Sequence, residues 1–139
     1  MRFSDGLKTK EWVHIWLDTC LDQYQKWGFG PYAVVEKRNQ AVIGYCGLFF
    51  FPDLDGEAEV EIGYRLIRST WGKGYATEAT RAVRDYAFTT LGIKRLIALV
   101  DPANLASIRV AEKIGMQYEK EIMLEGYTHS DHVYAIAGP

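Results

Sequence analysis

The spacing of apolar residues along the chain predicts three helices. In the first, side chains suited to burial recur every three or four positions between a candidate N-cap at Thr9 and a stop at Gly28. A second helical pattern extends from about Tyr75 to Thr90, and a shorter one over residues 107–114 is closed by Gly115. The buried face of the first helix is expected to consist of Trp12, Val13, Trp16, Leu17, Cys20, Leu21 and Tyr24.

Six other segments have the composition or the two-residue alternation of β-strands. Three of them precede the second helix, separated by a tight turn at residues 38–40 and a turn cluster at residues 52–56. Residues 95–100 form a nearly continuous apolar run, which is typical of a strand covered on both faces. The six predicted strands are residues 32–37, 41–51, 57–66, 95–100, 118–124 and 132–136.

The element order, α-β-β-β-α-β-α-β-β, predicts an α/β (α+β) fold. Consecutive strands joined by short turns pair most simply as antiparallel neighbours, whereas the long helix requires a right-handed β-α-β crossover. We therefore expect a mixed, mostly antiparallel sheet with helices on both faces. No internal repeat or linker interrupts residues 1–139, so a single domain is predicted.

Composition excludes several classes of function. A formal net charge of −2 argues against a nucleic-acid partner. Cys20 and Cys46 are too few for a disulfide framework, and no apolar stretch is long enough to span a bilayer, so we expect a cytoplasmic protein without a membrane partner. His129 and His132 lack Cys or Asp partners at ligand spacing, so no metal site is predicted. Cys46 lies in an apolar strand without a partner that could activate it as a nucleophile.

The segment R-S-T-W-G-K-G-Y-A-T-E-A at residues 68–79 connects a predicted strand to the long helix. Gly72 and Gly74 allow a sharp turn and a close approach of the backbone to a ligand. The helix that follows directs its free N–H groups and the positive end of its dipole into that turn. Strand, glycine turn and helix N-terminus together predict a phosphate-binding site. The alternative is that the glycines only shape the loop.

Two motifs resemble the acetyl-CoA-binding core of the GNAT acetyltransferase superfamily. The first is W-G-K-G-Y-A-T-E-A at residues 71–79, followed by Y-A-F at 86–88, L-G-I at 91–93 and Arg95. The second is N-L-A-S-I-R-V-A-E-K-I-G-M at residues 104–116. Within the superfamily, the chain is most similar to the branch that contains the ribosomal-protein N-terminal acetyltransferases. The resemblance covers residues 32–136 and implies the GNAT fold with acetyl-CoA as acetyl donor.

The resemblance also assigns residues to the cofactor. Leu66 and Ile67 would pair like a strand with the pantetheine arm, Asn104 would hydrogen-bond it, and Ser107 would lie near the sulfur. Arg68 and Lys73 would add positive charge near the pyrophosphate. The backbone amides expected to hold that pyrophosphate are those of Trp71, Gly72, Lys73, Gly74, Tyr75 and Ala76.

This sequence departs from the family pattern at three places. Ser69 stands where Gln or Arg is usual, although Arg68 adjoins it. Ala111 stands where many members carry the Tyr that protonates the leaving thiolate, and a Ser matching Ser107 has been proposed to substitute for it. The usual first strand and helix are not found before Thr9, so we expect either a misassigned start or a short protein. The uncovered apolar surface would favour a homodimer.

Glu57, Glu59 and Glu61 share one face of the strand at residues 57–66, and the apolar residues of the other face are Val60, Ile62 and Tyr64. Glu61 is the leading candidate for the base that deprotonates the acceptor amine, and Glu59 is the second. The alternative is that this face opens to water and that the glutamates only aid solubility. A backbone N–H near Leu66 or Ile67 would stabilise the developing oxyanion, and Ser107 would protonate the thiolate unless its hydroxyl only bonds local backbone.

The predicted function is direct acetyl transfer from acetyl-CoA to a primary amine, without a covalent enzyme intermediate. The acceptor would be a protein N-terminal α-amine or a small-molecule amine. Two alternatives remain open: a non-catalytic acyl-CoA sensor, and a self-associating structural domain that retains only the fold.

Overall fold

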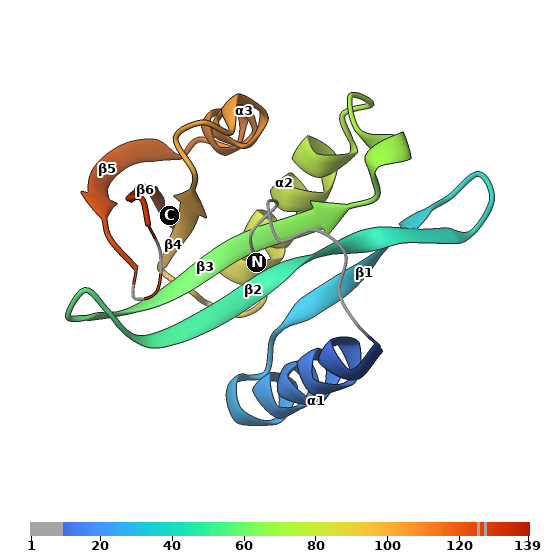
Figure 1. Cartoon of the computed structure of the whole chain (residues 1–139), viewed down its shortest axis with the longest axis horizontal. Helices are drawn as coiled ribbons and strands as arrows, with labels where there is room; N and C mark the ends of the chain where they lie inside the picture. The colour runs from blue at the N-terminus through green and yellow to red at the C-terminus, as the bar shows by residue number, and fades with distance from the viewer. Residues whose placement is uncertain (1–9, 125, 127) are drawn as a thin grey trace.

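The computed structural model describes residues 10–124, 126 and 128–139, which form one six-stranded sheet and three α-helices (Figure 1). The element order is the predicted one, while the proposed N-cap Thr9 lies outside the described residues. None of the described helices is both long and apolar enough to cross a membrane. The elements are α1 Lys10–Trp27, β1 Pro31–Glu36, β2 Ala41–Leu54, β3 Glu57–Leu66, the 3₁₀ turn η2 Arg68–Thr70, α2 Tyr75–Thr89, β4 Arg95–Val100, α3 Leu105–Lys113, β5 Gln117–Ile122 and β6 Asp131–Ala137.

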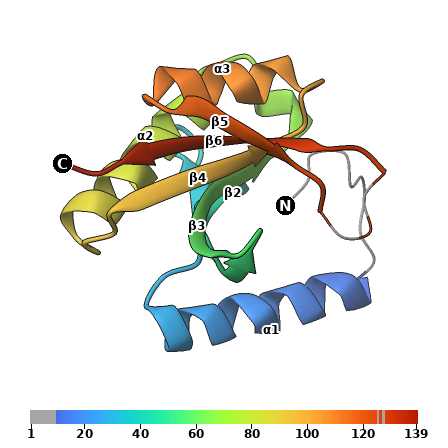
Figure 2. The same ribbon diagram turned by 90° about the vertical axis from the view of Figure 1, so that its left-hand side faces the viewer.

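The sheet is mixed, with strand order β1-β2-β3-β4-β6-β5. Every neighbouring pair is antiparallel except β3 and β4, which run parallel because α2 carries the chain back between them. Figure 2 shows α2 and α3 on one side of the sheet and α1 on the other. The predicted fold class, a mostly antiparallel mixed sheet with one β-α-β crossover and helices on both faces, is confirmed.

The apolar core is divided between the two faces. Leu96 and Ile97 are adjacent on β4 and fully buried, so their side chains point to opposite faces of the sheet. Leu96 belongs to the larger cluster, which Ala87 of α2 and Ala111 of α3 complete. Ile97 belongs to a smaller cluster formed by Leu54, Ile97, Ile122 and Val133. The helix-covered face therefore holds α2 and α3 rigidly against the middle of the sheet.

One predicted turn is shorter than expected. The sequence indicated a turn over residues 52–56, but β2 continues to Leu54, which pairs with Glu57 of β3. Only Asp55 and Gly56 form the reversal, and both have the positive φ angles that such a tight turn requires, 54° and 89°. The strand is extended because Leu54 is buried in the smaller cluster. The local turn signal of Pro52 is thus overridden by burial two residues later.

The parallel seam between β3 and β4 is short. In the described ladder, Glu61 and Ile97 are the single registered pair between the two strands. β3 continues for five residues beyond Glu61, while β4 ends three residues beyond Ile97. The C-terminal parts of the two strands therefore diverge, and the candidate site lies in the gap.

Candidate active site

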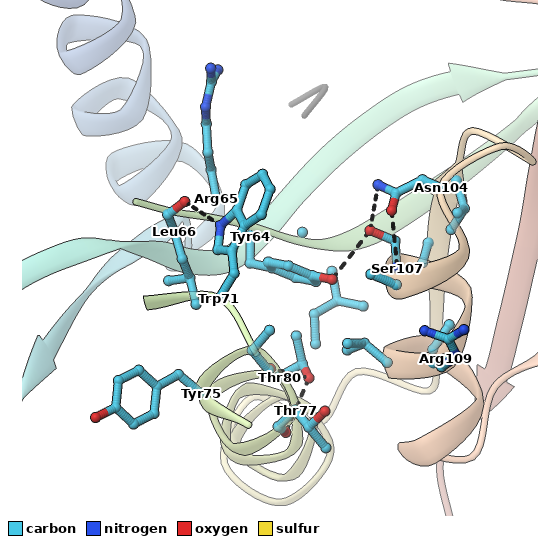
Figure 3. A pocket seen from close by; sticks show the side chains of 18 of the residues that line it. Tyr64, Arg65, Leu66, Trp71, Tyr75, Thr77, Thr80, Asn104, Ser107 and Arg109 are labelled. Carbon is cyan, nitrogen blue, oxygen red and sulfur yellow. Dashed lines mark hydrogen bonds between the residues drawn. The ribbon is translucent and has the colours of Figure 1, made fainter. Parts of the chain in front are cut away.

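A cavity of about 900 Å³ occupies the gap between β3 and β4 and continues to the N-terminus of α2 and to α3. Most of the site residues predicted from the sequence line it together (Figure 3). Two do not: Glu59 and Lys73 are outside the cavity lining. The predicted residues that line it are Glu61, Leu66, Ile67, Arg68, Trp71, Gly72, Gly74, Tyr75, Ala76, Asn104 and Ser107.

The glycine turn supplies a row of unengaged backbone donors at one end of this cavity. Gly72 and Gly74 have φ angles of 77° and 81°, and Gly74 is the N-cap of α2 without any side-chain cap. Among the described residues, no protein oxygen accepts a hydrogen bond from the N–H groups of residues 72–77. These donors, together with the helix dipole, make a site suited to phosphate.

Two predicted backbone donors are engaged elsewhere. The N–H of Trp71 donates to the carbonyl oxygen of Arg68 at 3.1 Å, so it is unavailable to a phosphate. The N–H of Ile67 donates to the carbonyl oxygen of Ile43 at 2.8 Å, which removes it as an oxyanion donor. Because N–H groups alternate between the two edges of a strand, the N–H of Leu66 faces the gap instead. Leu66 is therefore the remaining candidate of the two.

Trp71 and Tyr75 hold the turn through their side chains. The indole Nε1 of Trp71 donates to the carbonyl oxygen of Leu66 at 2.9 Å, which links the turn to the end of β3. The guanidinium of Arg68 lies over the same indole, with its Cζ atom 5.3 Å from the ring centroid. The Tyr75 hydroxyl donates to Glu36 at 2.6 Å, and this hydrogen bond lowers the pKa of the Glu36 carboxyl. The turn is thus fixed to both β3 and β1.

The two candidate bases differ in their surroundings. Glu61 is 5% exposed, lines the cavity, and accepts a hydrogen bond from the backbone N–H of Leu99 at 3.2 Å, where the strands diverge. Glu59 is 8% exposed and receives two hydrogen bonds of 2.9 Å from Arg95, which also pairs with Glu119. The face is therefore not open to water at either residue, and only Glu61 lies where a substrate could reach it.

Ser107 lies at the centre of a hydrogen-bonded group on the other wall. Asn104, the N-cap of α3, accepts from the Ser107 backbone N–H and donates through Nδ2 to the Ser107 hydroxyl at 2.8 Å. The Tyr64 hydroxyl lies 3.2 Å from the same Ser107 oxygen (Figure 3). Burial raises the pKa of the Tyr64 phenol, so its oxygen carries a proton at neutral pH.

Sequence reasoning missed Tyr64 and several cations of the site. Tyr64 was assigned to the apolar face of its strand, because nothing local distinguishes a cavity-lining Tyr from a core Tyr. Arg109 and Lys113 line the cavity, and their spacing of four residues on a predicted helix was the available signal that they share a face. Arg65 also lines it. These charges add to Arg68 and favour an anionic ligand.

Comparison with known proteins agrees with this geometry. The model of the acetyltransferase (GNAT) domain family matches residues 1–117. The uncharacterised N-acetyltransferase p20 of Bacillus licheniformis is 40% identical over 125 residues, which are 90% of this chain and 66% of p20, so the chain spans about two thirds of that relative. Spermidine N(1)-acetyltransferase of Escherichia coli is 37% identical over 65 residues, 47% of this chain and 35% of that protein.

Solved structures extend the likeness to the whole fold. An acetyltransferase from Agrobacterium tumefaciens superposes with a TM-score of 0.78 at 29% identity, covering 94% of this chain and 74% of its own. Ribosomal-protein-S5-alanine acetyltransferase from Vibrio fischeri gives a TM-score of 0.72 at 21% identity, over 91% of this chain and 70% of its own, which shows the fold alone. On the match of the family model, the chain belongs to the GNAT acetyltransferase family.

Proposed function

We propose that this protein transfers an acetyl group from acetyl-CoA directly to a primary amine. The observation that carries the proposal is the row of unengaged N–H groups at residues 72–77, at the mouth of a cavity between two diverging strands. The first N–H groups of any helix lack intrahelical partners, but here no side chain caps them and the turn that carries them lines the cavity, which suits an anionic ligand.

The donor set fits the cofactor. The amides of residues 72–76 would bind its pyrophosphate, with Arg68, Arg109 and Lys113 supplying positive charge from the cavity wall. The gap-facing edge of β3 at Leu66 and the amide of Asn104 would hold the pantetheine arm. Bound acetyl-CoA supplies an activated acetyl thioester and a thiolate leaving group.

Three groups of this chain would act on the reaction. Glu61 would accept a proton from the acceptor amine through water, because its carboxylate lies at the fork of the strands. The N–H of Leu66 would stabilise negative charge on the acetyl oxygen. Ser107, with its oxygen fixed by Asn104, would donate a hydrogen bond to the departing sulfur.

Two acceptor classes are supported by resemblance to other acetyltransferases. The resemblance of the motifs at residues 71–79 and 104–116 to the ribosomal-protein N-terminal acetyltransferase branch favours a protein N-terminal α-amine. The likeness to spermidine N(1)-acetyltransferase favours a polyamine. An α-amine has a reference pKa of about 7.7–8.0, against about 10.4 for a lysine-like amine, so an N-terminal acceptor needs less help from a base.

The test combines cofactor binding with acceptor turnover. Calorimetry should detect acetyl-CoA binding, and mass spectrometry of a panel of N-terminal peptides, polyamines and amino acids should show acetylation of at least one class. Binding without acetylation of any amine would indicate a sensor. Absence of binding would indicate a structural domain.

A further inference from the structure

The hydroxyl groups of Tyr64 and Ser107 carry two protons, but the hydrogen bond between them uses only one. Their oxygens are 3.2 Å apart, and either hydroxyl can be the donor in that hydrogen bond. If Ser107 donates to Tyr64, the Tyr64 proton is available to a ligand. If Tyr64 donates to Ser107, the Ser107 proton is available instead. In both arrangements, one O–H is left for a group in the cavity that both residues line.

Asn104 limits the directions in which the Ser107 hydroxyl can donate its proton. Its Oδ1 accepts from the Ser107 backbone N–H, so its Nδ2 must be the group that faces the Ser107 hydroxyl oxygen, 2.8 Å away. That oxygen is therefore already an acceptor, and its own proton must point to Tyr64 or into the cavity. A negative sulfur in the cavity would attract this proton, and Tyr64 would then turn its O–H to the Ser107 oxygen.

We propose that Tyr64 is the source of the proton that the departing CoA thiolate receives, delivered through the Ser107 hydroxyl. This inference rests on the proposed transferase function and deepens it. Tyr64 is a positioning residue in this scheme, since Ser107 alone contacts the sulfur. The phenol from β3 thereby supplies an acid that position 111 of α3 cannot, because Ala111 is buried there and has no titratable group.

The proton transfer balances without a further reactant. As the carbon–sulfur bond breaks, its electron pair stays on sulfur, which takes the Ser107 proton while Ser107 takes the Tyr64 proton. The Tyr64 phenolate then recovers a proton from water, and the proton lost by the acceptor amine leaves through Glu61. Ser107 ends unchanged. A phenol is a far stronger acid than an alkanol, so Ser107 without Tyr64 is a poor proton source.

The groups around Tyr64 leave this relay intact at neutral pH. Burial of the ring raises the pKa of the Tyr64 phenol, the Ser107 hydrogen bond lowers it, and Cys46 on β2 makes a smaller contribution that raises it. The neighbouring cavity residues of α2, Thr77 and Thr80, do not titrate. Burial raises the pKa of the Cys46 thiol to about 12, so Cys46 does not ionise in the range of interest.

The first test measures the thiol pKa of CoA bound to the protein, which needs no acceptor. The pKa is read from the ultraviolet absorbance of the thiolate, with bound desulfo-CoA as the blank that removes all protein signals. Tyr64→Phe removes one oxygen and keeps the ring. It should lower the ionisation constant of the bound thiol roughly three- to tenfold, and Ser107→Ala should lower it more.

Because Tyr64 acts only through Ser107, the double variant should match Ser107→Ala alone. Tyr118→Phe, on the exposed surface of β5, should leave the constant unchanged. An unchanged thiol pKa in Tyr64→Phe, or additive effects in the double variant, overturns the relay while leaving the transferase proposal standing. Failure of the wild-type protein to bind CoA overturns both.

The second test uses the acceptor that the amine panel identifies. Fluorinated tyrosine at position 64 keeps the hydroxyl in place and makes the phenol more acidic. The alkaline limb of kcat should move to lower pH with each added fluorine, whereas a structural role for Tyr64 predicts an unmoved limb. Tyr64→Phe should lower kcat roughly 10–100-fold with little change in acetyl-CoA affinity.

Discussion

Each end of the contact between β3 and β4 holds a buried glutamate, but the surroundings of the two glutamates differ. Glu59 and Glu61 lie two positions apart on one face of β3, and both are buried. At the closed end, Arg95 of β4 binds Glu59 through two hydrogen bonds and joins the strands. At the open end, Glu61 accepts a hydrogen bond from the backbone N–H of Leu99, and the strands diverge around the cavity.

On the proposed mechanism, β3 therefore contributes to stability at Glu59 and to the reaction at Glu61, two residues further along the same face. A carboxylate fixed by a guanidinium fork has little freedom to move a proton. The Glu61 carboxylate accepts from the backbone N–H of Leu99 at 3.2 Å and lines the cavity, so it lies where a proton could be exchanged with a bound ligand. The following substitutions act at the open end first and at the closed end afterwards, in order of expected effect.

The largest effect is expected for Gly74→Trp in the turn. A side chain at φ 81° strains the backbone by roughly 1–2 kcal/mol and covers the N–H groups that face the cavity. Acetyl-CoA affinity measured by calorimetry should fall more than about 100-fold, or about 2.7 kcal/mol. Gly92→Trp is the matched control, since φ is 68° at the opposite end of α2 and that residue does not line the cavity. Equal affinities in the two variants would remove the turn from the cofactor site.

Glu61→Gln should lower kcat by roughly 100-fold at a pH below the pKa of the acceptor amine. The deficit should shrink as pH rises through that pKa, because an already neutral amine needs no base. A Gln carbonyl oxygen still accepts from Leu99, so the fork of the strands is kept. Glu57→Gln, on the exposed start of the same strand, is the control. A deficit that is constant across the pH–rate profile would contradict a role as base.

At the closed end, Arg95→Met should destabilise the fold by about 2–3 kcal/mol at pH 7. Glu59 would remain as a buried charge without its partner, although the partial exposure of Arg95 moderates the loss. Urea unfolding should show recovery when Glu59→Gln is added. The matched control is Lys120→Met, which breaks an exposed ion pair with Asp55 and should cost less than about 1 kcal/mol. No recovery in the double variant would mean that Arg95 acts by packing alone.

The smallest effect is expected for Glu119→Gln. Arg95 lowers the pKa of the Glu119 carboxyl in the folded protein. Its stabilisation is therefore complete above the unfolded pKa of about 4.3 and is lost as pH falls through the lower folded value. Both side chains are more than a third exposed, so the contribution at pH 7 is below about 1 kcal/mol. Between pH 3 and pH 7, the free energy of unfolding of Glu119→Gln should fall less steeply with acid than that of Glu121→Gln. Identical pH dependences in the two variants would exclude a contribution of the Glu119 pKa shift to stability.

The sequence predicted the elements well, but periodicity did not always indicate burial: Val13, Leu17 and Leu21 of the expected buried face of α1 are exposed. The alternation of Glu59, Val60, Glu61 and Ile62 placed β3 and its two faces correctly, because an error of one residue would invert every side chain. The predicted end of β2 was wrong because Pro52 signals a turn, whereas the burial of Leu54 depends on Ile97, Ile122 and Val133, which are 43 to 79 positions away in the chain.

The site was predictable only as far as local chemistry defines it. Gly72 and Gly74 predicted unengaged backbone amides, because the strand, the turn and the helix that form this site are consecutive in the sequence. Nothing local separates Glu59 from Glu61, because Arg95, which distinguishes them, is 36 residues from Glu59. Tyr64 was missed for the same reason: its partner Ser107 is 43 residues away and is brought to it by the packing of α3.

The hydrogen bond from the Tyr75 hydroxyl to Glu36 also limits which groups of the turn can contact a ligand. With the Tyr75 hydroxyl bound to Glu36 on β1, the hydrogen-bond donors that residues 72–76 offer a phosphate are main-chain N–H groups, which every amino acid except proline possesses. An anchor of this kind is indifferent to side-chain identity and sensitive only to the path of the backbone. The opposite wall, which must choose among amines, is built from side chains and can therefore be altered one residue at a time without loosening the anchor.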